Sequence, residues 1–147
     1  MSASEIQKLR EVTSAGVMDC KRALAEAKGN FDEALKIIQK NGLSKAEKRA
    51  DRKTGAGLVH SYVHSERVGV IVELRSETDF VAHSEPFRAL IHDIAMHIAA
   101  MAPLTVEELV AQPFVRDESR TIKDLVTELT SKVGEKIEVG KFYRIEV

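Results

Sequence analysis

Residues 73–82 read Glu-Leu-Arg-Ser-Glu-Thr-Asp-Phe-Val-Ala, and this stretch joins the end of an alternating apolar segment to a polar turn. The alternation before it has a period of two residues, which predicts a β-strand over 68–75. At the turn, Asp79 stands next to Phe80. A carboxylate favours hydrogen-bond donors or a cation whereas an aromatic ring favours an apolar pocket, so the pair is difficult to bury together. One solution is that both side chains contact another molecule.

The segments around this stretch predict an α+β domain. Residues 58–64 form a second strand, and the short turn at 65–67 makes an antiparallel hairpin with the strand over 68–75. Two apolar stripes of helical spacing follow, one from Phe87 to Met101 and one from Ile122 to Val133. Residues 137–147 alternate again and predict a returning strand. We therefore expect a three-stranded antiparallel sheet packed by helices over residues 56–147.

The first 42 residues have a different pattern. Three short apolar stripes of helical spacing are separated by Gly16 and Gly29, and the third is expected to end at Asn41-Gly42. This pattern predicts a three-helix bundle over residues 1–42. Residues 44–53 contain no large apolar side chain, so residues 43–55 are interpreted as a charged linker or solvated helix. A basic patch that contacts RNA remains an alternative for this segment.

The charge distribution also divides the chain. Residues 1–53 hold 12 Lys or Arg against 8 Asp or Glu, while residues 54–147 hold 10 against 15. This asymmetry indicates two units, but it is weaker than the basic clustering expected of a nucleic-acid-binding domain. Cys20 is the single cysteine, so no internal disulfide forms. Without a signal-peptide pattern or a membrane-spanning run, we expect a cytoplasmic protein with no membrane association.

No set of residues predicts catalysis or metal binding. His60 and His64 share a strand face but lie about 13 Å apart at about 3.3 Å per residue, too far for one zinc ion. His92 and His97 do not superpose on a helix. Phosphate-binding glycine loops and nucleophile motifs are also missing from the sequence. We expect no cofactor, no metal and no enzymatic activity.

Val17 and Met18 are a second candidate contact surface. They precede the apolar stripe of the second helix, which runs from Cys20 to Ala27 and does not require them. They either pack the turn onto the bundle or form an exposed apolar patch for a partner. Asp19, at the start of the same helix, complements the helix dipole but would repel phosphate, which argues against DNA recognition here.

Two motifs together resemble the bacterial translation elongation factor Ts family. The first is residues 9–24, Leu-Arg-Glu-Val-Thr-Ser-Ala-Gly-Val-Met-Asp-Cys-Lys-Arg-Ala-Leu, and the second is residues 73–82. The similarity extends over most of the chain, including residues 112–117, with departures at Ser14, Val17 and Arg75. The segment between Met101 and Gln112 is shorter than in long members, which leaves open whether the protein is a monomer or a homodimer.

The resemblance implies a guanine-nucleotide exchange factor for the GTPase elongation factor Tu. It implies that Thr78, Asp79, Phe80 and Val81 disturb the magnesium site of the GTPase. It also implies that Leu9, Val17 and Met18 contact its G domain, and that the bundle is like a ubiquitin-associated (UBA) domain. The alternative functions are a UBA-like adaptor and a weak RNA-binding module.

Overall fold

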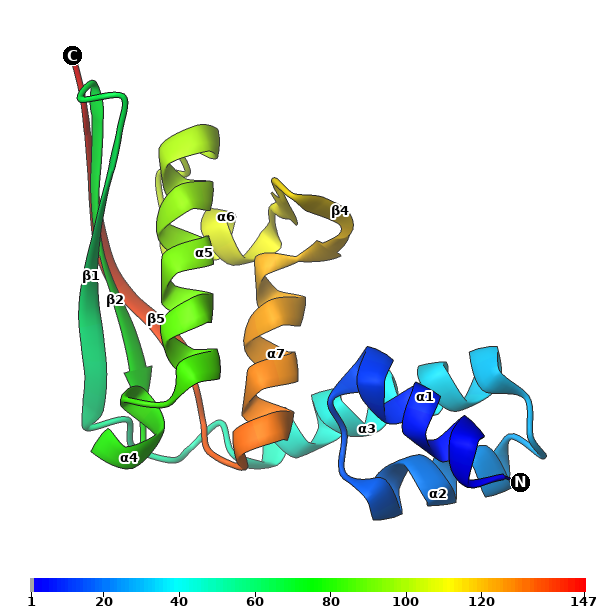
Figure 1. Ribbon diagram of the computed structural model, residues 1–147. Helices are drawn as coiled ribbons and strands as arrows, with labels where there is room; N and C mark the ends of the chain where they lie inside the picture. The colour runs from blue at the N-terminus through cyan, green and yellow to red at the C-terminus, as the bar shows by residue number, and fades with distance from the viewer. Residues whose placement is uncertain (1) are drawn as a thin grey trace.

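The N-terminal stripes form three helices in a computed structural model that describes residues 2–147. Figure 1 shows them grouped at one end of the molecule. They are α1 (Ala3–Thr13), α2 (Val17–Glu26) and α3 (Phe31–Lys48). A small buried cluster holds them together, with Leu9, Cys20 and Leu24 among its members. The three-helix arrangement agrees with the sequence prediction, whereas the likeness to a UBA domain stays a prediction.

The predicted end of the third helix is wrong. Instead of stopping at Asn41-Gly42, α3 continues through both residues to Lys48 and takes in half of the segment that we interpreted as a linker. The cause is tertiary packing, because α3 crosses α7 (Ile122–Val133) at Gly42. A Cβ at this position would lie 3.1 Å from Oγ of Ser131, so the missing side chain permits the close approach.

The rest of the chain forms the α+β core. Its sheet is antiparallel with the order β1-β2-β5, and the strands are β1 (Ala56–His64), β2 (Val68–Ser76) and β5 (Glu138–Glu146). The predicted hairpin and the returning strand are therefore confirmed. The three-residue connection at 65–67 places Ser65 and Glu66 at φ of 50° and 59°, in the left-handed region that tight hairpin turns require.

Helices cover one face of this sheet. Figure 1 shows α5 (Glu85–Met101) lying along the sheet, with α7 on the far side of α5. The main buried cluster fills the space between the sheet and these helices, and Phe87, Ile94 and Ile98 are completely enclosed in it. The elements that sequence reasoning did not resolve are α4 (Asp79–Ala82), α6 (Val106–Ala111), β3 (Pro113–Phe114) and β4 (Asp117–Thr121).

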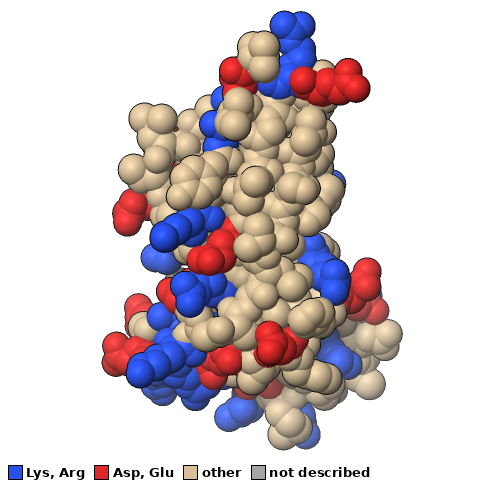
Figure 2. All heavy atoms as spheres, turned by 90° about the vertical axis from the view of Figure 1, so that its left-hand side faces the viewer, with Lys and Arg blue, Asp and Glu red and all other residues tan. Residues whose placement is uncertain are grey.

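The opposite face of the sheet has no covering element among residues 2–147. Antiparallel sheets with one solvated face usually carry polar side chains there, but here a group of large apolar residues faces outward. Figure 2 shows this face as an area largely free of charged side chains, between charged groups above and below it. The large exposed apolar residues on it are Val59, Val63, Ile71, Tyr143 and Ile145, which we call the outer sheet face.

Candidate functional site

The motif at residues 77–82 forms a sharp turn directly after β2, which we call the elbow. Thr78 is the N-cap of the single-turn helix α4, and its Oγ1 accepts a hydrogen bond of 3.3 Å from the backbone N–H of Val81. The buried Ser76, the last residue of β2, donates from its hydroxyl to the carbonyl of Thr78 at 2.9 Å. The elbow is therefore tied to the end of the strand that precedes it.

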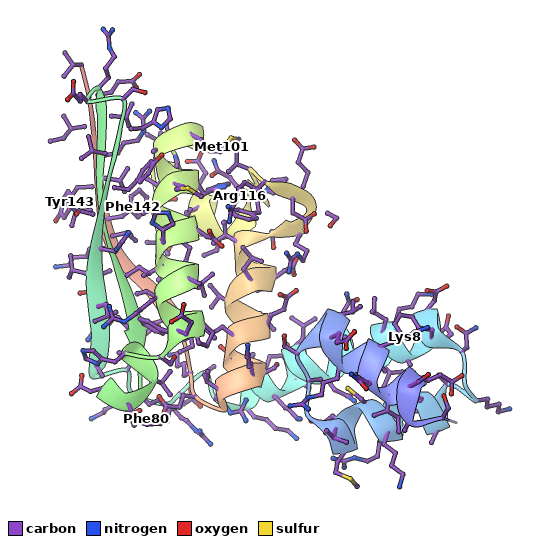
Figure 3. The ribbon with its side chains drawn as sticks, viewed as in Figure 1. Lys8, Phe80, Met101, Arg116, Phe142 and Tyr143 are labelled. Atoms are coloured by element: carbon purple, nitrogen blue, oxygen red, sulfur yellow. The ribbon has the colours of Figure 1, made fainter. Side chains whose placement is uncertain are left out.

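The elbow presents an aromatic ring and an acid to solvent. Phe80 is 87% exposed, and Figure 3 shows its side chain at the foot of the sheet, directed away from the body of the molecule. Asp79 and Thr78 are also exposed, whereas Val81 is buried and packs into the core. Three of the four predicted elbow residues are thus accessible to a partner, and Val81 anchors the turn from inside.

A second carboxylate holds the elbow from a distant part of the chain. Oε1 of Glu135 accepts from the backbone N–H of Thr78 at 3.0 Å, and Oε2 accepts from the Thr78 hydroxyl at 2.8 Å. Glu135 follows α7, and it is 57 residues from Thr78 in sequence. Sequence reasoning missed Glu135, because no local pattern signals a bond between such distant segments.

Glu77, the first residue of the elbow, binds two segments that are distant in sequence. Its Oε1 accepts from the backbone N–H of Lys136 at 2.7 Å, and Nη1 of Arg52 lies 3.4 Å from the same oxygen. The backbone hydrogen bond, more than the charge of Arg52, lowers the pKa of Glu77 below its ordinary value. Glu77 therefore joins the elbow to both the segment after α7 and the segment after α3.

The N-terminal candidates divide into surface and interior residues. Val17 and Met18, on the first turn of α2, are 49% and 61% exposed, so the apolar patch is accessible. Leu9 is different: it is 0% exposed and belongs to the buried cluster of the bundle. A buried side chain cannot touch a partner, so the expected direct contact by Leu9 is replaced by a packing role. Val12, near the end of α1, is also exposed.

Asp19 connects this patch to the long helix. Its Oδ2 lies 2.7 Å from Nζ of Lys45 in α3, and its Oδ1 lies 2.9 Å from Nη2 of Arg22. The hydrogen bond from Lys45 is the main reason that the pKa of Asp19 is below its ordinary value. The start of α2 is thereby fixed against the part of α3 that continues toward the core.

The histidines do not assemble into a metal centre. Nε2 of His60 lies 3.1 Å from Nδ1 of His92, a pairing of β1 with α5 that the sequence did not predict. His97 is buried and hydrogen-bonded within the core. Residues 2–147 contain no group of three or more His, Cys, Asp or Glu positioned to hold a metal ion. Over the same residues, no helix is both long enough and apolar enough to cross a membrane.

Comparison with known proteins identifies many similar chains. The family model described as elongation factor TS matches residues 2–108 and residues 77–147. Elongation factor Ts of Moorella thermoacetica is 37% identical over an alignment that covers 100% of this chain and 95% of the relative. The elongation factor Ts proteins of Fervidobacterium nodosum and Alkaliphilus oremlandii are 39% and 38% identical, with 98% and 89% of their lengths covered. These alignments span 192 or 193 positions, more than the 147 residues here, so the relatives carry segments that this chain lacks.

Proposed function

Because the chain belongs to the elongation factor Ts family of translation elongation factors, we propose that it is a guanine-nucleotide exchange factor for elongation factor Tu. It binds the GDP-bound GTPase and promotes GDP release by disturbing the Mg²⁺ and nucleotide site. It remains bound until GTP enters. The observation that carries this proposal is the exposure of Phe80 beside Asp79 on an anchored turn.

An exchange factor needs a difference in affinity and no chemistry of its own. GDP held at nanomolar affinity represents about 12 kcal/mol of binding free energy. A factor that binds the nucleotide-free GTPase more tightly than the GDP-bound GTPase lowers the affinity for GDP by the same factor, because coupling between two binding sites is reciprocal. Such a protein requires neither a cofactor nor a catalytic residue.

Phe80 and Asp79 supply this difference in complementary ways. The ring of Phe80 has almost no contact with its own chain, so it is free to insert between elements of the GTPase and gain burial there. The adjacent Asp79 brings a negative charge toward the surroundings of the magnesium ion, which hold the phosphates of the nucleotide. Thr78 and Val81 hold the turn in shape, through its N-cap and through the core.

The N-terminal patch supplies affinity in this proposal. Val17 and Met18, which are exposed on the first turn of α2, contact the G domain. Leu9 acts from beneath by packing α1 against α2 and α3. Because Asp19 joins α2 to α3, the patch is presented on a bundle with a fixed position.

The test of the proposal is the release of fluorescent GDP from elongation factor Tu, followed by stopped flow. We expect Phe80→Ala to slow release at saturating factor by at least about ten-fold while leaving the thermal unfolding of the protein nearly unchanged. Leu104→Ala is a matched control, since Leu104 is also highly exposed but follows the opposite end of α5. Release by Phe80→Ala at the wild-type rate would refute the proposal.

The alternatives from the sequence have less support. An RNA-binding surface over residues 45–53 would use its five basic side chains, and two of them are already engaged, Lys45 with Asp19 and Arg52 with Glu77. A gel shift with transfer RNA at two salt concentrations tests this alternative, because phosphate contacts weaken steeply with salt. A UBA-like adaptor would bind through the bundle alone and would not need the elbow. The proposed function also implies a cytoplasmic location, where translation factors act.

We further propose that two copies of the chain associate through the outer sheet face. Ile71 lies at its centre, opposite Ser61 on β1 and Tyr143 on β5. A twofold axis through this point would place two apolar sheets face to face, about 10 Å apart as in β-sandwiches. The charged groups bordering the face in Figure 2 would then form a polar rim around the contact.

A further inference from the structure

The elbow and the segment that follows α7 hold each other by a reciprocal pair of carboxylate bonds. Glu135 accepts from the backbone N–H of Thr78, and Glu77 accepts from the backbone N–H of Lys136. Residues 77 and 78 therefore face residues 135 and 136, and the acid of each pair binds the backbone of the other pair. We call this arrangement the carboxylate clamp.

The clamp matters because the exposed part of the elbow depends on contacts outside itself for its shape. The helix α4 is only four residues long, far shorter than a helix that is stable in isolation. Phe80 contributes almost no packing to its own chain, so its direction depends entirely on the backbone that carries it. Hydrogen bonds from a backbone N–H to an ionised carboxylate are about twice as strong as neutral ones.

We infer that Glu135 is a positioning residue that sets the direction in which Phe80 is presented to the GTPase. This inference rests on the proposed function, and it assigns a role to a residue outside the motif. Both oxygens of Glu135 bind Thr78, so the N-cap residue cannot rotate without breaking two bonds. The Thr78 hydroxyl donates to Glu135 while accepting from Val81, and thus links the clamp to the first turn of α4.

The same clamp connects the elbow to the basic segment after α3. Glu77 pairs with Arg52, and Nζ of Lys136 donates to the carbonyl of Ala50 at 2.6 Å. The elbow is consequently held by the segment after α3 and by the segment after α7. The loss of one carboxylate oxygen is expected to loosen the elbow without unfolding the core, since Glu135 is not one of the buried residues.

The test compares Glu135→Gln with Glu108→Gln. Glu108 is a matched control because its carboxylate also accepts from an exposed backbone N–H, that of Leu104 at 2.9 Å, at the opposite end of α5 from the elbow. Hydrogen exchange of the free proteins, measured by NMR, reports the clamp directly. We expect Glu135→Gln to raise the exchange rate of the Thr78 amide at least about ten-fold, and Glu108→Gln to leave it unchanged.

The functional measurement is GDP release as a function of factor concentration. Glu135→Gln is expected to lower the maximal rate about five-fold while the half-saturating concentration stays within about two-fold, because the bundle surface is intact. Glu135→Asp keeps the charge but shortens the side chain, so it is expected to give an intermediate rate. A general loss of stability would instead lower the active fraction and would also show in thermal unfolding.

Each contrary result has a separate meaning. An unchanged Thr78 amide rate in Glu135→Gln would overturn the clamp. Faster amide exchange with wild-type GDP release would overturn the positioning role, provided that Phe80→Ala slows release. If Phe80→Ala itself leaves release unchanged, the proposed function and the positioning role both fail, and amide exchange still reports whether the clamp exists.

Discussion

The backbone N–H of Val115 donates a hydrogen bond of 3.2 Å to Nδ1 of His97, which is buried in the core. Because Nδ1 is the acceptor, the ring proton resides on Nε2, which donates to Oε1 of Gln112 at 2.9 Å. The neutral imidazole of His97 therefore links α5 to Gln112, just before β3, and to Val115, just after it. Protonation of this ring would place a second proton against the N–H of Val115.

This relationship predicts that stability falls in mildly acidic solution. Burial lowers the pKa of His97 below its ordinary value, against the opposing effect of the Gln112 bond. The stability that neutral His97 contributes to the folded state is fully present above the unfolded-state pKa of about 6.5. It is lost as the pH falls through the lowered folded-state pKa. The expected slope is at most about 1.4 kcal/mol per pH unit for one proton, measured by urea denaturation between pH 7.5 and 5. His60, whose pKa is lowered mainly by burial, titrates in the same direction, so His60→Gln is the background for comparing His97→Asn.

Leu9 and the Val17–Met18 pair should separate stability from binding. Leu9→Ala creates a cavity in the small buried cluster and is expected to destabilise the protein by about 2–5 kcal/mol. The double variant Val17→Ala, Met18→Ala removes exposed groups and should cost less than about 0.5 kcal/mol. Calorimetric titration with nucleotide-free elongation factor Tu should show the double variant binding at least about ten-fold more weakly. Undiminished affinity would exclude the patch as a contact surface.

Gly57 is expected to tolerate no side chain. Its φ is 156°, and a Cβ would lie 2.4 Å from the carbonyl oxygen of Leu74, a backbone atom of the paired strand. Gly57→Ala should therefore destabilise the protein by about 1–3 kcal/mol. Gly69→Ala, on the neighbouring strand where a Cβ meets nothing within 4 Å, is the control with little expected effect. Thermal denaturation of the two variants provides the comparison, and equal midpoints would contradict the assigned geometry.

Association through the outer sheet face is tested by Ile71→Lys. A charge at the centre of a face-to-face sheet contact would be buried without a partner, so the variant should sediment as a monomer at concentrations where the wild type dimerises. Leu104→Lys adds the same charge at another exposed apolar position and should leave the assembly unchanged. A wild-type protein that is monomeric at all concentrations in analytical ultracentrifugation would refute the dimer.

The sequence predicted the elements with strong periodicity and missed those set by distant contacts. The stripe from Phe87 to Met101 became α5, and the alternating residues became the three strands, because each pattern matches the face that the element buries. Asn41-Gly42 is a local stop signal, yet α3 passes through it because packing against α7 outweighs helix propensity.

The candidate site followed the same division. The motif at residues 73–82 predicted a turn that presents Phe80 to another molecule, and Phe80 is exposed in the structure. The bond from Glu135 to Thr78 joins residues 57 apart, and neither residue has a local signature of it. The burial of Leu9 follows from the apolar stripe of the first helix, whereas the family resemblance implied a direct contact with a partner.

Because α3 is one continuous helix, its length fixes how the N-terminal helices are placed relative to the sheet. Each residue of an α-helix advances the chain by 1.5 Å and turns it by about 100°. One residue inserted between Lys40 and Leu43 would therefore rotate α1 and α2 around the helix axis relative to the sheet, with every side chain of both surfaces unchanged. The spacing and the angular phase between Met18 and Phe80 are thus encoded in a residue count, which no substitution at either surface can restore.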